Sequence, residues 1–140
     1  MAAVEDLYSR AIVGWAVSDT PDTALTRRAL DAAVARRRPG PGLVVHSDRG
    51  CQYTSAEYRR ALADRRAVGS YSRKGNCWDN APMESFFASL KKELVYRVTF
   101  ATRADAERAM FEYIEVFYNR VRRHSTLGYV APAVFEVGQP

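Results

Sequence analysis

The sequence predicts one α/β domain in which a mixed sheet is flanked by helices. Short β-rich runs come first and then alternate with longer segments whose apolar residues recur at helical spacing. A chain of 140 residues with 47% hydrophobic content is long enough to bury a single core. The β-rich runs are residues 2–4, 12–17, 43–45 and 67–71, and the helical segments begin near residues 20–22, 55, 80 and 102.

The first half of the chain predicts a hairpin and a helix. Alternating residues at 2–4 and 12–17 are separated by a polar stretch at 6–10, which is typical of two strands joined by a turn. Thr20 or Asp22 is the expected cap of the helix that follows, and the arginine, proline and glycine residues at 36–42 end it.

A short apolar run at residues 43–45 predicts a buried strand that leads into a loop. Asp48 would lie at the carboxyl end of that strand. Residues 55–64 predict a short helix, and residues 67–71 predict a further short strand before a polar loop.

Two more helices are expected. Asn80 is the predicted cap of the first, Pro82 is tolerated in its first turn, and Glu84 lies near its beginning. Thr102 to Asp105 resembles a capping box, and the helix that it starts should run to about His124. Apolar faces are formed by Met83, Phe86, Phe87 and Leu90 in the first helix, and by Ala106, Met110, Tyr113, Ile114, Phe117 and Tyr118 in the second.

Composition sets broad limits on function. The net charge of +5 and the sequence pI near 9.5 favour a polyanionic partner, without choosing between nucleic acid and a membrane surface. Cys51 and Cys77 are too few for a disulfide scaffold and lack metal-ligand spacing, so a reduced cytosolic compartment is expected. We find neither a signal peptide pattern nor a long apolar run, and we expect a soluble, unsecreted protein.

Asp48 and Glu84 are the candidates for chemistry. Carboxylates at a strand end and a helix start are rigidly held, and hard oxygen ligands are what Mg²⁺ requires. Two such groups could hold metal that activates water on a phosphodiester. The ordinary alternative makes Asp48 a turn residue and Glu84 a first-turn acid favoured by the helix dipole. Spacing alone leaves both interpretations open.

Several residues are candidate contacts to nucleic acid. Lys91 and Lys92 could hold a phosphate, as could Arg73 and Lys74, although a solvated basic surface explains such residues equally well. Trp78 could stack on an unpaired base, and the alternative is a core contact that anchors its loop. His46 and His124 have no partner ligands at metal spacing and are expected to be structural.

Two long motifs resemble bacterial insertion-sequence transposases with a retroviral-integrase-like core. They are His-Ser-Asp-Arg-Gly-Cys-Gln-Tyr-Thr-Ser at residues 46–55 and Ser-Arg-Lys-Gly-Asn-Cys-Trp-Asp-Asn-Ala-Pro-Met-Glu-Ser-Phe-Phe at residues 72–87. Asp-Leu-Tyr-Ser-Arg at 6–10, Val-Gly-Trp at 13–15, Tyr-Asn-Arg at 118–120 and Arg-His-Ser-Thr-Leu-Gly-Tyr at 123–129 extend the resemblance over nearly the whole chain.

The resemblance implies a ribonuclease-H-like fold that cuts and joins DNA strands with three acids and two divalent ions, Mg²⁺ or Mn²⁺. Asp48 matches the second acid and Glu84 the third. The first acid belongs to a strand before the hairpin, which these residues do not contain, and Asp6 matches a turn of the family rather than the catalytic position. The chain would then be a partial catalytic core over residues 1–128, truncated at its amino end, with a tail over 129–140.

The same resemblance sets the expected partners. They are DNA, at element ends and at the target, and either a second copy of the chain or a full-length transposase. No membrane partner is expected. The expected location is the bacterial cytoplasm, in association with the nucleoid. With one acid absent, we expect weak Mg²⁺ binding and little strand transfer by the chain alone. The alternatives are a non-catalytic DNA-binding or regulatory fragment and a decayed gene remnant.

Overall fold

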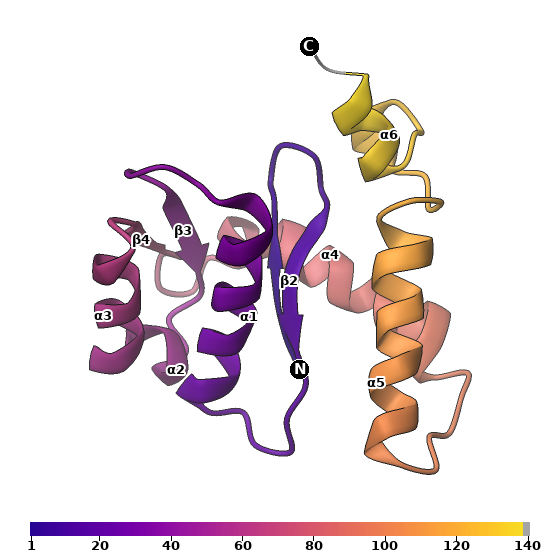
Figure 1. Cartoon of the computed structure of the whole chain (residues 1–140), viewed down its shortest axis with the longest axis horizontal. Coiled ribbons are helices and arrows are strands. Elements are labelled where there is room, and N and C mark those ends of the chain that lie inside the picture. The colour runs from indigo at the N-terminus through magenta and orange to yellow at the C-terminus, as the bar shows by residue number, and fades with distance from the viewer. Residues whose placement is uncertain (139–140) are drawn as a thin grey trace. The chain divides into compact units, whose positions relative to one another are not determined.

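The computed structural model describes residues 1–138, apart from the side chain of Cys77 (Figure 1). The chain forms two compact units. The first unit consists of Met1–Val4 and Val13–Ala81. The second consists of Glu5–Ile12 and the residues from Pro82 onward.

The chain begins with the predicted hairpin. Strands β1 (Ala2–Glu5) and β2 (Ile12–Ala16) form a two-stranded sheet. The Asp6 backbone N–H donates to the Ala11 carbonyl at 2.8 Å, and an Asp6 carboxylate oxygen accepts from the Tyr8 N–H at 2.9 Å. The polar stretch therefore forms the turn, as its residue types predict.

Helix α1 (Thr23–Arg37) packs closely against this hairpin. Asp22 caps it by accepting a hydrogen bond from the Leu25 N–H at 2.9 Å, which is one of the two expected caps. A Cβ atom at Gly14 would lie 2.2 Å from the Ala29 carbonyl oxygen, so only glycine allows β2 to approach the helix this closely.

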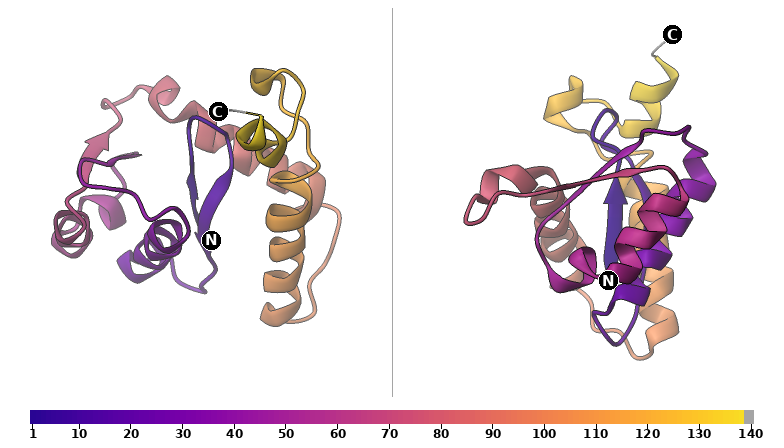
Figure 2. Two further views of the ribbon diagram at one scale, coloured as in Figure 1. Left: turned by 45° about the horizontal axis from the view of Figure 1, so that its top comes forward. Right: turned by 90° about the vertical axis from the view of Figure 1, so that its left-hand side faces the viewer.

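The opposite side of α1 packs against a second layer. Helices α2 (Cys51–Thr54) and α3 (Ala56–Asp64) follow strand β3 (Val44–Ser47), and Leu30 of α1 packs with Tyr58 and Leu62 of α3. Figure 2 shows α1 between the hairpin and α3. The α3 prediction is confirmed, with Ser55 as its cap, whereas the short helix α2 was not predicted.

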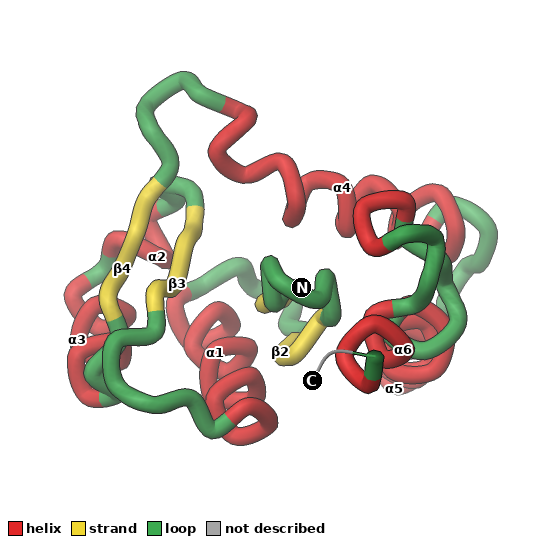
Figure 3. The backbone as a smooth tube through the Cα atoms, turned by 90° about the horizontal axis from the view of Figure 1, so that it is seen from above, coloured by secondary structure: helices red, strands yellow, loops and turns green. Residues whose placement is uncertain are grey.

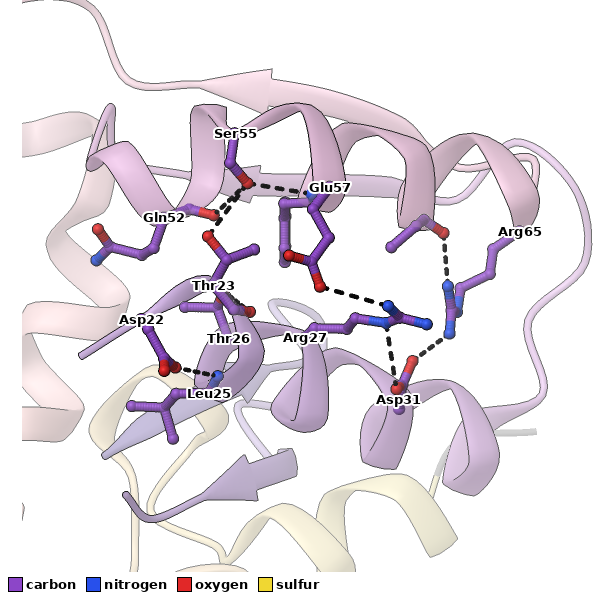
Figure 4. Close-up of polar contacts among 12 residues, drawn as sticks. Asp22, Thr23, Leu25, Thr26, Arg27, Asp31, Gln52, Ser55, Glu57 and Arg65 are labelled. Carbon is purple, nitrogen blue, oxygen red and sulfur yellow. Dashed lines mark hydrogen bonds and ion pairs between the residues drawn. The ribbon is translucent and has the colours of Figure 1, made fainter. Parts of the chain in front are cut away.

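Polar contacts join α1 to α3 along their exposed side (Figure 4). Arg27 lies 3.4 Å from Glu57 of α3, and Asp31 pairs with Arg65 just after α3. Exposed ion pairs of this kind are worth little individually. The helix pair is therefore held mainly by its apolar contacts.

Strands β3 (Val44–Ser47) and β4 (Val68–Tyr71) form a parallel pair, with α2 and α3 as the crossover between them. The prediction that β3 is buried is wrong, because Val44 is 61% exposed. Its neighbour in β4, Val68, is 56% exposed. Parallel strands are normally covered on both faces and flanked by further strands. In the described residues the sheet has only these two strands, so its apolar side chains remain in contact with solvent.

The outer edge of β3 carries backbone groups without a partner strand. The Leu43 carbonyl accepts a hydrogen bond from the Val68 N–H of β4, and the Ser47 carbonyl accepts one from the Ser72 N–H just after β4. Because successive residues of a strand point their backbone groups to opposite sides, those of Val44 and His46 point away from β4. Figure 3 shows β3 on the side of β4 that is nearer the hairpin, and no third strand pairs with it in the part of the chain described.

The second unit is helical apart from the hairpin turn. Helix α4 (Ala81–Leu90) continues into the wider turn η2 (Lys91–Val95), and α5 (Arg103–Phe111) continues likewise into η3 (Glu112–Tyr118). The predicted Thr102 cap is confirmed, but the helix ends at Tyr118 rather than near His124. Short elements η4 (Ser125–Leu127) and α6 (Pro132–Val137) follow.

Asn80 does not cap α4 as predicted. The preceding turn η1 (Cys77–Asn80) is already helical and runs directly into α4. The capping position moves to Asn76, whose side chain accepts a hydrogen bond from the Trp78 N–H at 3.1 Å. Sequence patterns place a helix more securely than its first residue.

Aromatic side chains fill the core of the second unit. Phe86 of α4 meets Tyr118 edge to face at 5.1 Å between ring centroids, and Tyr118 contacts the His124 ring at 4.7 Å. The Tyr113 hydroxyl donates to Glu93 at 2.6 Å. The predicted core role of Tyr113 and Tyr118 is therefore confirmed.

Asn119 joins the hairpin turn to this core. Its side chain accepts a hydrogen bond from the Ile12 N–H and donates one to the Ile12 carbonyl, both at 2.9 Å and both buried.

We predict that Asn119→Ala lowers the free energy of unfolding by about 2 to 4 kcal/mol, because two buried backbone groups lose their partner. Denaturant unfolding measures this loss. Thr126→Ala, at an exposed position, is the control, and an equal small effect of both variants would contradict the role of Asn119.

Glu5 is a buried acid in the second unit, with its side chain only 1% exposed and 3.0 Å from Arg10. Burial raises the pKa of Glu5 from its ordinary 4.5 to about 7, although Arg10 opposes the shift. The folded chain therefore binds this proton more tightly than the unfolded chain. The resulting stability is fully present below pH 4.5 and is lost as the pH rises through about 7.

We predict that wild type loses about 3 kcal/mol of stability relative to Glu5→Gln between pH 4.5 and 8. Urea unfolding across this pH range gives the difference. Burial lowers the pKa of His124, which acts in the opposite direction but is common to both proteins. Glu112→Gln is the exposed control, and a difference that does not change with pH would contradict a buried, proton-binding Glu5.

Candidate active site and nucleic-acid contacts

Asp48 directly follows β3 and is exposed, as its predicted position requires. One carboxylate oxygen, Oδ1, accepts a hydrogen bond from the Gly50 N–H at 2.7 Å, which fixes the side chain over its own turn. The turn role and the catalytic role are therefore compatible, because Oδ2 carries no hydrogen bond within the described residues.

The ends of β3 and β4 are tied together beside Asp48. The two ring nitrogens of His46 lie 2.9 Å from the Ser70 hydroxyl and 3.2 Å from the Ser72 hydroxyl. Arg49 donates from Nε to the Ser72 carbonyl at 2.8 Å. His46 thus has the structural role expected for it. Residues before and after Asp48 in the chain, His46 and Arg49, are both hydrogen-bonded to residues near the end of β4.

Glu84 lies in the first turn of α4 and is exposed. Phe86 and Leu90 of the same helix are buried and anchor its other face. The predicted position of Glu84 is therefore confirmed. Glu84 belongs to the second unit and Asp48 to the first.

Both acids have the chemistry of a magnesium ligand. Each offers a hard carboxylate oxygen at the end of a rigid element, which suits Mg²⁺ or Mn²⁺. Among residues 1–138 the structure brings no three acidic, histidine or cysteine side chains into a group that could hold a metal ion.

Lys91 and Lys92 are exposed in η2, directly after α4. The backbone is α-helical up to Leu90 and widens from Lys91 onward, where the Lys91 carbonyl accepts a hydrogen bond from the Tyr96 N–H at 2.9 Å. Their contact with a phosphate stays a prediction.

Arg73 is engaged within its own loop. Its guanidinium donates to both carboxylate oxygens of Asp79 at 3.0 Å, and its backbone N–H donates to Asp79 at 2.8 Å. These hydrogen bonds lower the pKa of Asp79 to about 2. This role of Asp79 could not be predicted from the sequence, because an irregular loop gives no periodic pattern that would place the two side chains together. Lys74 is exposed in the same loop.

In the described part of the chain, we find no helix that is both long and apolar enough to cross a membrane.

Known proteins resemble this chain in sequence. The integrase core domain family matches residues 1–77, and a second integrase core domain family matches residues 84–138. The chain is 47% identical over 131 residues to the transposase for insertion sequence element IS904 of Lactococcus lactis, covering 94% of this chain and 52% of that protein. It is 45% identical over 136 residues to the transposase InsF for IS3A of Escherichia coli, covering 97% of this chain and 47% of that one. The chain thus spans about half the length of these curated relatives.

Solved structures share the fold. The catalytic core domain of BIV integrase aligns with a TM-score of 0.66 and 15% identity, covering 96% of this chain and 83% of that one. The HTLV-2 integrase catalytic core domain, solved in complex with magnesium, aligns with a TM-score of 0.64 and 14% identity, covering 94% and 80%. The predicted ribonuclease-H-like fold is confirmed by these cores, and the chain belongs to the integrase core domain family.

Proposed function

We propose that this chain acts in DNA transposition as part of a transposase that cuts and joins DNA strands, with Asp48 and Glu84 as two of its three catalytic acids. The exposed Asp48 at the end of β3 carries the proposal, since it is an uncovered carboxylate held at a strand end of an integrase-type core. The relatives named as transposases support DNA as the partner.

The proposed reaction displaces one oxygen at a phosphodiester. An attacking water or terminal hydroxyl forms a bond to phosphorus and gives up its proton, while the bond to the departing oxygen breaks and that oxygen takes up a proton. Divalent ions, when bound, would activate the attacking oxygen and offset the charge that develops on phosphorus. Asp48 and Glu84 would hold those ions through carboxylate oxygens.

The sheet supports the proposal that the first acid is missing from these residues. The outer edge of β3 ends at Asp48, and its backbone groups at Val44 and His46 face no third strand in the described residues. A further parallel strand along this edge would end beside Asp48, because parallel neighbours end at the same edge of a sheet. We infer that an acid at the end of such a strand completes the site.

We predict little or no cleavage or strand transfer by the purified chain with Mg²⁺ or Mn²⁺ and a labelled element-end duplex. With only two acids, the two metal ions would lack a carboxylate that bridges them. Robust cleavage by the chain alone that is lost in Asp48→Ala would show that the site is already complete.

A second cleavage assay supplies the proposed additional strand. The chain is co-expressed with the part of the Lactococcus lactis IS904 transposase that it does not match, and metal-dependent cleavage should appear. It should be lost in Asp48→Asn and Glu84→Gln but kept in Asp64→Asn, an exposed acid at the end of α3. Salt-sensitive duplex binding with no cleavage in the reconstituted sample would favour the non-catalytic DNA-binding alternative instead.

A further inference from the structure

Trp78 is exposed to an unusual degree for its side chain. It lies in η1 with 82% of its surface in solvent, although it is among the largest apolar side chains in the protein. Within the described residues its ring takes part in no aromatic pair and no contact with a cation. The alternative that Trp78 anchors its loop by a core contact is therefore wrong.

The loop that presents this ring is closed by its own polar contacts. We call residues 73–79 the Arg73–Asp79 loop, after the charged pair whose three hydrogen bonds join its two ends. Inside it, Asn76 accepts from the Trp78 N–H, and Gly75 adopts a left-handed turn with φ +73°. The backbone that carries the indole is thus constrained before any ligand arrives, which reduces the ordering cost of binding.

The charge of the loop favours a polyanion. Arg73 and Asp79 neutralise each other, so the remaining charge of the loop is that of the exposed Lys74. The loop therefore carries an exposed aromatic ring, Trp78, and an exposed cation, Lys74, four residues apart in the chain. Proteins bind single-stranded nucleic acid with these two kinds of group, because bases stack on aromatic rings and phosphates pair with cations. A base inside an intact duplex has both faces covered by its neighbours.

We propose that Trp78 stacks on an unpaired base of a DNA strand, with Lys74 contacting an adjacent phosphate. The preferred ligand is accordingly a strand with an unpaired or frayed end rather than a blunt, fully paired duplex. This proposal rests on the proposed action on DNA and adds the form of DNA that the Arg73–Asp79 loop recognises. It involves only binding, so it can be measured without metal and without cleavage.

Binding to three labelled DNAs tests the proposal, using fluorescence anisotropy without divalent metal. They are a short single strand, a duplex with an unpaired overhang and the same duplex with a blunt end. Trp78→Ala should weaken binding to the first two about 5- to 100-fold, as loss of one stacked base implies, and binding to the blunt duplex less than about 2-fold. Trp78→Phe should recover part of the loss, because phenylalanine keeps an aromatic face.

Two controls separate stacking from charge and folding. Tyr96→Ala removes another exposed aromatic side chain, 74% in solvent, from the second unit and should bind all three DNAs as wild type does. Lys74→Ala should lower the affinity for all three DNAs by a similar factor. It should also reduce the slope of log affinity against log salt concentration by about the amount expected for one phosphate contact. Circular dichroism of each variant should match wild type.

Tryptophan emission gives an independent readout. Adding single-stranded DNA should quench wild-type emission, and this quenching should be absent in Trp78→Phe. Equal affinity of wild type and Trp78→Ala for the overhang duplex, with no quenching, would overturn the stacking role while leaving DNA binding intact. Failure of wild type to bind any of the three DNAs would overturn the proposed function and the stacking role together.

Discussion

The close contact between β2 and α1 at Gly14 is the constraint on which the first unit depends. A side chain at position 14 would collide with the Ala29 carbonyl of α1. Because Gly14 has none, the hairpin lies directly against α1. The opposite side of α1 then meets α3 through Leu30, and α3 leads into β4. One helix thereby joins two small sheets that share no strand within the described residues.

This arrangement explains why β3 is exposed although its sequence is apolar. A parallel pair depends on neighbours for cover, and α1 and α3 cover only part of it. Edge strands with open backbone groups are sites for pairing with another strand. The strand edge that ends at Asp48 is therefore open to pairing within the described residues, and the proposed additional acid would lie on a strand added along this edge.

Local patterns predicted much of this structure. The hairpin, the Asp22 cap of α1, the positions of Asp48 and Glu84 and the Thr102 cap all follow from residue type and spacing within a few positions. Features that depend on distant partners could not be predicted this way. The contact of Asn119 with Ile12, 107 positions away in the chain, and the exposure of Val44 depend on tertiary neighbours. An apolar run such as residues 43–45 does not reveal whether a neighbouring strand exists. The pairing of Arg73 with Asp79 is local, but an irregular loop gives no periodic pattern from which it could be predicted.

Amide hydrogen exchange along β3 tests most directly whether this strand lacks a neighbour. In the chain alone, the amides of Val44 and His46 should exchange quickly, whereas those of Val45 and Ser47, which face β4, should be protected. Supplying the unmatched part of the related transposase should slow exchange at Val44 and His46 specifically. Protection of Val44 and His46 in the chain alone, or no change on adding the partner segment, would contradict an open strand edge beside Asp48.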